Sequence, residues 1–183
     1  GNEALRFVME YQDEIFARLP IVFFCISDYN LACRAAKNPY MSGFYENDYL
    51  NETINLATSL FPKRKTLIAL HDQSSAGSND SKMFWSLRDK YPGYFFSDLD
   101  TSLLSQTDLV SLLESLPSDA LLFYLSCYTD KSGNVYSMLS RTSTIVRSSN
   151  VPIFRNYEGG EDMGILGGVH MDIENQCMMA GDM

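Results

Sequence analysis

Polar side chains suited to ligand binding follow several apolar runs of the sequence, at the points where buried strands would end. They carry hydroxyl, carboxylate, amide or phenol groups, and they are Ser27, Asp28, Asp72, Gln73, Ser74, Tyr128 and Tyr157. An ionised carboxylate accepts hydrogen bonds from an amine or hydroxyl, and a tyrosine offers a flat apolar ring with a polar tip. Such a set can orient a small polar or aromatic solute. Polar loops also follow strands in α/β proteins generally, so any single residue of the set shows little by itself.

The signatures of common enzyme classes do not occur in the sequence. There is no GxSxG, GxxxxGK[ST] or HExxH, and the two Gly-Gly pairs do not complete a GxGxxG. Ser74, His71 and Asp72 have the residue types of a hydrolase triad, but neighbours in one loop point apart and cannot form the relay. A phospho-acceptor receiver domain needs an acidic pair and a distal lysine, which Asp72 and Asp98 lack. We therefore expect no catalytic residues, and a cytosolic α/β enzyme with an unrecognised site is the alternative from another class.

Composition argues against a metal site and against a nucleic-acid partner. The 4 cysteines form no CxxC pair and have only 2 histidines beside them, so converging zinc ligands are not expected. The formal net charge of −9 is spread along the chain, and 63–65 is its one basic cluster. Binding to a phosphate backbone needs clustered lysine and arginine. We expect no metal, no cofactor and no nucleic-acid partner.

Apolar runs and amphipathic segments alternate along the chain and predict the scaffold that must position the polar set. Continuous apolar runs predict strands near 21–27, 66–71, 94–97, 120–126 and 151–154. Helical spacing and flanking prolines predict helices over 3–17, 48–61, 81–90, 108–116 and 137–147. The alternation predicts a doubly wound α/β fold with a mostly parallel sheet. Because ligands bind beyond the carboxyl ends of such strands, the polar set should converge on one edge.

The length of 183 residues suits one large domain or two small lobes. The weakest joint is 37–43, where Pro39 and Gly43 bracket a short polar segment. We expect part of a first lobe at 1–36, a crossover at 37–45, a second Rossmann-like lobe at 46–155 and a segment returning toward the first lobe at 156–183. No stretch approaches the roughly 20 apolar residues that a membrane span needs. The chain opens at Gly1 with a helix where doubly wound domains usually open with a strand, so we expect a piece of a longer receptor whose first lobe is incomplete.

Four segments resemble the motifs of one protein family, in the same order and over almost the whole chain. Residues 20–28 (PIVFFCISD) resemble "vPVVFxGVND", and Ser42-Gly43-Phe44 with Glu46 and the 48–62 helix resembles "TGVxE…LfP". Residues 66–77 (TLIALHDQSSAG) are similar to "ixvixDxTxxG", and 164–168 (GILGG) to a late "GxvGG". The family is the bacterial ABC-transporter substrate-binding-protein-like group, with the type 1 periplasmic-binding fold.

The resemblance implies two Rossmann-like lobes around a ligand cleft and an extracytoplasmic location, membrane-anchored in the full-length parent. Ser27 and Asp28 would line the cleft from the first lobe; Asp72, Gln73 and Ser74 from the second; and Tyr128 and Tyr157 from later strand ends. Three positions depart from the family pattern: Cys25 and Ile26 replace small residues, and Ser42 replaces threonine.

The family occurs both as free solute-binding proteins and as sensor modules of membrane histidine kinases and diguanylate cyclases. Our leading hypothesis is the sensor module, with a small-molecule solute and the cytoplasmic signalling module of the same parent chain as partners. The alternative within the family is the solute-binding protein of an ABC transporter. An incomplete first lobe would leave the edge of the 21–26 strand open, so we also expect self-association, for example as a homodimer.

Overall fold

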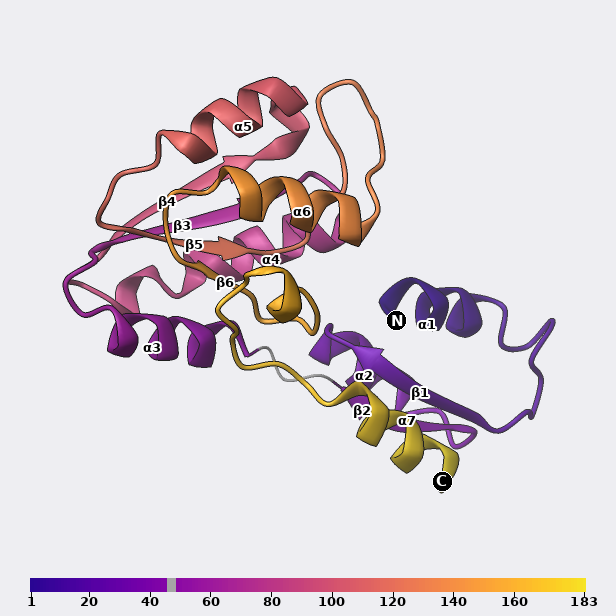
Figure 1. Ribbon diagram of the computed structural model, residues 1–183. Helices are drawn as coiled ribbons and strands as arrows, with labels where there is room; N and C mark the ends of the chain where they lie inside the picture. The colour runs from indigo at the N-terminus through magenta and orange to yellow at the C-terminus, as the bar shows by residue number, and fades with distance from the viewer. Residues whose placement is uncertain (46–48) are drawn as a thin grey trace. The chain divides into compact units, whose positions relative to one another are not determined.

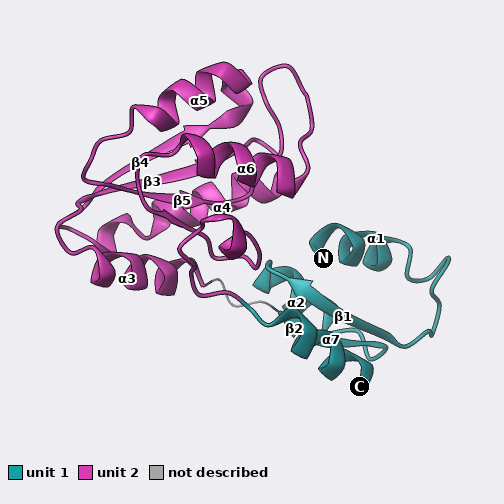
Figure 2. Ribbon diagram, viewed as in Figure 1, with its two compact units in different colours: residues 1–48, 171–183 teal, residues 49–170 magenta. Residues whose placement is uncertain are grey.

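The computed structural model describes residues 1–45 and 49–183, and it divides the chain into two compact units. Unit 1 comprises Gly1–Asp48 and Met171–Met183, and unit 2 comprises Tyr49–His170 (Figure 2). Within the expected crossover at 37–45, Met41–Tyr45 is a strand of unit 1, and within the expected return segment at 156–183 the chain re-enters unit 1 at Met171. Glu46 of the second motif lies outside the described residues.

Unit 2 is built on a four-stranded parallel sheet with the order β4-β3-β5-β6 (Figure 1). Its strands are β3 (Thr66–His71), β4 (Phe95–Asp100), β5 (Ala120–Tyr124) and β6 (Ile153–Phe154). Its helices are α3 (Leu50–Leu60), α4 (Ser75–Ser86), α5 (Gln106–Glu114) and α6 (Met138–Ser148), with single 3₁₀ turns η1 (Arg88–Lys90), η2 (Thr101–Leu103) and η3 (Glu161–Met163).

The two faces of this sheet bury separate apolar layers. Successive side chains of a strand point to opposite faces, so Leu122 and Tyr124 of β5 pack with α5 and α6 while Leu121 and Phe123 pack with α3 and α4. All five residues of β5 are buried, which explains why its sequence ALLFY is apolar without alternation. The predicted α/β class with parallel sheets is confirmed.

Unit 1 is a smaller α/β unit in which two parallel strands share a core with helices. β1 (Ile21–Ile26) pairs with β2 (Met41–Tyr45), and α2 (Tyr29–Ala35) connects them. α1 (Asn2–Glu10) contributes Leu5 to a core with Phe23, Ile26 and Leu31, and α7 (Ile173–Gly181) contacts both strands. No helix in the part of the chain that is described is long and apolar enough to cross a membrane.

Several element bounds differ from those predicted, for local reasons. α1 ends at Glu10 rather than 17, and Arg18 takes a left-handed φ of 61° before β1. α4 starts at Ser75 rather than 81, because Ser74 caps it. β4 runs on to Asp100, since its polar second half still pairs with β3. α2, β2 and α7 were not predicted.

Candidate ligand-binding edge of unit 2

The strand order of unit 2 creates a switch point between β3 and β5. The chain leaves β3 toward β4 on one side, and it leaves β5 toward β6 on the other. In open α/β sheets, ligands bind outside the carboxyl ends of the strands at such a point, because the diverging connections leave a crevice there. Of the predicted set, Asp72, Gln73 and Ser74 follow β3, Tyr128 follows β5 and Tyr157 follows β6.

Asp72 ties the two sides of the switch point together. Its Oδ2 accepts hydrogen bonds from the backbone N–H of Tyr128 (2.7 Å) and Thr129 (2.9 Å) and from Oγ1 of Thr129 (3.0 Å). Its Oδ1 accepts from the N–H (3.0 Å) and the hydroxyl of Ser74. Burial raises the pKa of this carboxyl, but the hydrogen bonds from Ser74, Tyr128 and Thr129 outweigh burial and hold the pKa below its usual value. Asp72 is fully buried and its oxygens are occupied, so it orders the edge.

The motif from Asp72 to Gly77 has a structural explanation at each of its fixed positions. Ser74 caps α4, because its hydroxyl accepts a hydrogen bond from the N–H of Gly77 at 3.1 Å. Gly77 lies against Asp72, so a Cβ there would be 2.4 Å from both the backbone oxygen and Oδ1 of Asp72. Real Cβ atoms do not approach oxygen so closely. The aspartate, the hydroxyl residue and the glycine therefore form one turn that leads from β3 into α4.

Gln73 and Tyr128 lie nearer the surface of this edge. The Gln73 side chain is exposed and donates to the carboxylate of Asp100, while its backbone N–H donates to Oγ of Ser102 at 2.8 Å. Tyr128 is half-buried and fixed through its backbone to Asp72. Both residues lie beside the switch point and are at least partly exposed.

Tyr157 belongs to a second group at the end of β6, together with Asp80 of α4 and Arg155. The phenol of Tyr157 donates to Oδ1 of Asp80 at 2.7 Å, and Oδ2 of Asp80 accepts from the N–H of Ser126 at 2.9 Å. Burial raises the pKa of Asp80 despite these bonds. The guanidinium carbon of Arg155 lies 4.3 Å from the ring centroid of Tyr124 and 5.6 Å from that of Tyr157. Sequence reasoning missed Arg155, although its place directly after a predicted strand was a usable signal.

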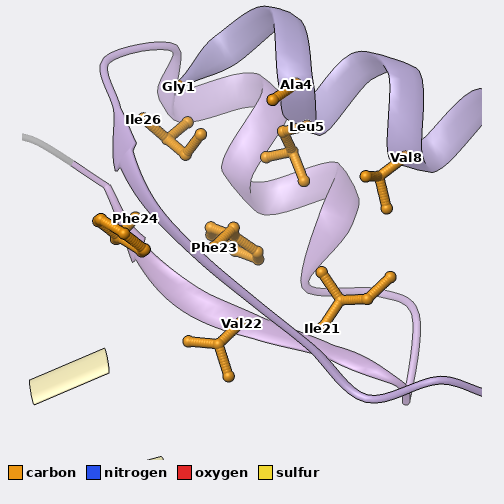
Figure 3. Close-up of a pocket in the computed structure, with 9 residues that line it drawn as sticks. All are labelled: Gly1, Ala4, Leu5, Val8, Ile21, Val22, Phe23, Phe24 and Ile26. Atoms are coloured by element: carbon orange, nitrogen blue, oxygen red, sulfur yellow. The ribbon is translucent and has the colours of Figure 1, made fainter. Parts of the chain in front are cut away.

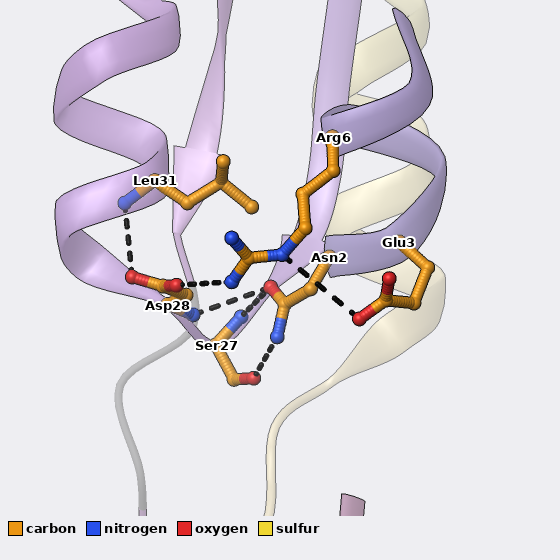
Figure 4. Close-up of polar contacts among 6 residues, drawn as sticks. All are labelled: Asn2, Glu3, Arg6, Ser27, Asp28 and Leu31. Carbon is orange, nitrogen blue, oxygen red and sulfur yellow. Dashed lines mark hydrogen bonds and ion pairs between the residues drawn. The ribbon is translucent and has the colours of Figure 1, made fainter. Parts of the chain in front are cut away.

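Ser27 and Asp28 lie in unit 1, after β1, where they bind the first turns of two helices (Figure 4). Oδ1 of Asp28 caps α2 by accepting from the N–H of Leu31, and its Oδ2 forms an ion pair with Arg6 at 2.7 Å. The N–H of Leu31 and the Arg6 guanidinium together lower the pKa of Asp28. Asn2 bonds the backbone and the hydroxyl of Ser27. A shared cleft for all seven predicted residues stays a prediction.

A hollow of about 220 Å³ lies between α1 and β1 (Figure 3). Its walls are apolar side chains, among them Leu5, Val8 and Phe23. A ligand site normally adds a few polar groups that fix the orientation of its solute. No polar side chain of the described residues lines the hollow, so the polar edge of unit 2 is the stronger candidate.

Unit 2 also contains a buried histidine beside an aspartate and a buried cysteine. His71 is buried and its Nε2 lies 2.9 Å from Oδ2 of Asp98, which also faces Nε1 of Trp85 at 3.4 Å. Burial raises the pKa of the Cys127 thiol to about 11, which makes this cysteine a poor nucleophile. No group of three or more potential ligands able to hold a metal ion occurs among residues 1–45 and 49–183.

No protein-family model and no curated protein matches this sequence. Among solved structures, the chain is similar to the ABC domain from Streptococcus pneumoniae in complex with L-Trp, with a TM-score of 0.67 and 16% identity over 99% of this chain and 61% of that chain. It is also similar to a conserved domain protein from Vibrio cholerae O1 biovar eltor, with a TM-score of 0.63 and 14% identity over 89% of this chain and 54% of that chain. The chain thus spans less than two thirds of either neighbour. Together with the parallel sheets and their helices, these likenesses show a periplasmic-binding-like fold.

Proposed function

We propose that this chain belongs to a small-molecule-binding domain, with its solute held at the carboxyl edge of β3, β5 and β6 in unit 2. The observation that carries the proposal is the switch point between β3 and β5, where the buried Asp72 fixes the backbone of Tyr128 and Thr129. A fixed backbone presents its neighbouring side chains in one arrangement, so a solute does not have to order them on binding. This arrangement supports binding of a ligand.

The fold likeness and the aromatic side chains support a solute of about amino-acid size. A neighbour of the same fold holds L-Trp, and this edge carries the half-buried rings of Tyr128 and Tyr157. Flat phenol rings contact an aromatic or apolar body well, and their hydroxyls keep a polar tip available.

Thermal unfolding of the protein in the presence of the common L-amino acids, each at millimolar concentration, tests this function. A ligand that binds only the folded state stabilises by about 2.7 kcal/mol at 100 times its Kd, so a true solute raises Tm in a concentration-dependent way. Tyr128→Ala should weaken the effect, while Tyr40→Ala, an exposed tyrosine of unit 1, should leave it unchanged. No shift with any amino acid, or equal shifts in both variants, would contradict the proposal.

For the parent protein we propose an extracytoplasmic, membrane-anchored sensor domain of a histidine kinase or diguanylate cyclase. The support is the order of the four sequence motifs, with the solute-binding protein of an ABC transporter as the alternative. The full-length reading frame separates them. A sensor predicts flanking transmembrane segments and a cytoplasmic signalling module, whereas a binding protein predicts a signal peptide with a lipidated cysteine. A reading frame with neither would contradict both.

A further inference from the structure

Arg155, the residue directly after β6, is a buried cation with no acidic partner in contact. The residue is only 4% exposed. Five ion pairs occur among the described residues, and none of them involves Arg155. Two of its guanidinium nitrogens, Nε and Nη1, are buried and make no hydrogen bond within the described chain. The nearby Asp80 carboxyl attracts this charge without a hydrogen bond to Nε or Nη1. Buried N–H groups left without an acceptor are destabilising, so these two nitrogens need a partner.

The surroundings hold this charge in a defined place and leave the N–H groups of Nε and Nη1 without an acceptor. The Tyr124 ring lies 4.3 Å and the Tyr157 ring 5.6 Å from the guanidinium carbon. Asp80 anchors the Tyr157 phenol, and the N–H of Arg155 donates to the carbonyl of Gly167 at 3.1 Å. Gly168 also packs on this residue, since a Cβ there would be 1.8 Å from the Arg155 carbonyl oxygen. The site is therefore built around Arg155.

A second buried arginine of the same unit shows the contrast. Arg141 is fully buried, but it donates to Oε1 of Gln106 and to the carbonyl of Thr129, both at 3.0 Å, and it stacks on Tyr136 at 4.1 Å. Its role is to join α6 to the loop after β5 and to the start of α5. Nε of Arg141 also lacks an acceptor, but its Nη1 and Nη2 both bond to the protein, whereas Arg155 makes no bond through either Nε or Nη1. A tether of the kind that Arg141 makes through Nη1 is therefore missing at Arg155.

We propose that Arg155 is the anion-binding residue of the solute site and that the solute carries a carboxylate. This inference rests on the proposed function. The planar guanidinium matches the two oxygens of a carboxylate and pairs with it through charge-assisted hydrogen bonds. Phosphate has similar oxygens, but its second charge would meet the nearby Asp80 carboxyl, and a single guanidinium neutralises only one charge. The carboxylate would sit by Arg155, and the tyrosines would contact the body of the solute.

The test compares carboxylates with their amides on the whole chain and on two matched arginine variants. The probes are L-tryptophan, L-tyrosine and L-leucine, the carboxamide of each, and inorganic phosphate, measured by calorimetry at constant ionic strength. The variants are Arg155→Met and Arg141→Met, each of which removes a buried charge and keeps an unbranched side chain. The unfolding midpoint of each variant without any probe is measured alongside.

We expect at least one amino acid to bind the unmodified chain at least ~30-fold more tightly than its amide, and Arg155→Met to lose at least ~30-fold for that acid alone. Without a probe, Arg155→Met should unfold at or above the midpoint of the unmodified chain, while Arg141→Met should unfold earlier because its acceptors lose their donor. Equal affinity for acid and amide, or unchanged affinity in Arg155→Met, overturns the inference and leaves the proposed function standing. Two other results also overturn the inference: phosphate binds and the amino acids do not, or Arg155→Met lowers the unfolding midpoint as far as Arg141→Met does. If no probe binds, the proposed function fails, and the inference with it.

Discussion

Replacing Asp72 by alanine should be among the most destabilising single changes in unit 2. The side chain is fully buried and accepts five hydrogen bonds, three of them from the backbone N–H groups of Ser74, Tyr128 and Thr129. A buried donor left without a partner costs about 1–3 kcal/mol, whereas the two hydroxyls can turn to other acceptors. Water entering the site recovers part of the loss, so we expect the free energy of unfolding to fall by about 3–5 kcal/mol.

Urea unfolding followed by tryptophan fluorescence measures this loss directly. The chain has a single tryptophan, Trp85, which lies on α4 of unit 2, so its signal reports the unit in question. Asp72→Asn keeps one oxygen acceptor, so its free energy of unfolding should lie between those of the unmodified chain and Asp72→Ala. Asp89→Ala, an exposed aspartate with no side-chain hydrogen bond in the described chain, is the control and should change little. A loss below about 1 kcal/mol for Asp72→Ala, or one equal to the control, would refute the reasoning.

The stability difference between the unmodified chain and Asp72→Ala should also depend on pH. Because the folded state holds the pKa of Asp72 below its usual value of 3.8, the stability it contributes is present above that value and is lost as pH falls through the folded pKa. The gap between the unmodified chain and Asp72→Ala should therefore narrow below about pH 3.8. Measuring solute affinity in Asp72→Ala separates two roles of Asp72. An unchanged affinity with a lowered Tm means that Asp72 orders the edge, whereas a lost affinity with an unchanged Tm means that Asp72 contacts the solute directly.

Three further predictions concern other parts of the chain. Cys25 has a left-handed φ of 55°, so Cys25→Gly should raise the free energy of unfolding by about 1 kcal/mol and Cys25→Val should lower it, as read by calorimetry. β1 pairs only with β2 among the described residues, so sedimentation should show self-association that the exposed Phe24→Lys weakens; a concentration-independent monomer contradicts this. Hydrogen bonds from Asn134 and Tyr136 lower the pKa of Asp130 to about 2. In an acid titration, the stability lost in Asp130→Asn should therefore be present above pH 3.8 and vanish toward pH 2. A stability difference that does not change with pH contradicts this prediction.

The strands β3 and β5 of unit 2 were predictable because both of their faces are buried. A strand covered on both sides must be apolar throughout, and the runs that became β3 and β5 have that composition. The start of α4 was not predictable in the same way. Its first turn, SSAG, reads as a polar loop, and it is helical because Ser74 caps it and Gly77 fits against Asp72. These contacts depend on the fold of the whole edge rather than on local propensity.

Unit 1 was harder to predict, since its elements are short and half-exposed. β2 has the sequence MSGFY, with a glycine and no alternation, and it is a strand because β1 lies beside it. α2 was not predicted either. Asp28 looked like a ligand-binding carboxylate, whereas its partners are the N–H of Leu31 in the first turn of α2 and the guanidinium of Arg6. The residue types of a helix cap and of a binding site are the same here, so sequence alone does not separate them.

The residues that carry the family resemblance are those that shape the backbone of the edge. Asp72, Ser74 and Gly77 form the turn into α4, Gly168 gives the backbone room beside Arg155, and Cys25 has positive φ at a position where the family motif has a small residue. A protein of this fold needs these turns whatever solute it binds, so such motifs predict the architecture and not the ligand. Arg155 lies outside all four motifs, and its Nε and Nη1 are buried without a hydrogen-bond acceptor in the described chain. The choice of solute then has to come from residues outside these turns, and Arg155 is the first place to test it.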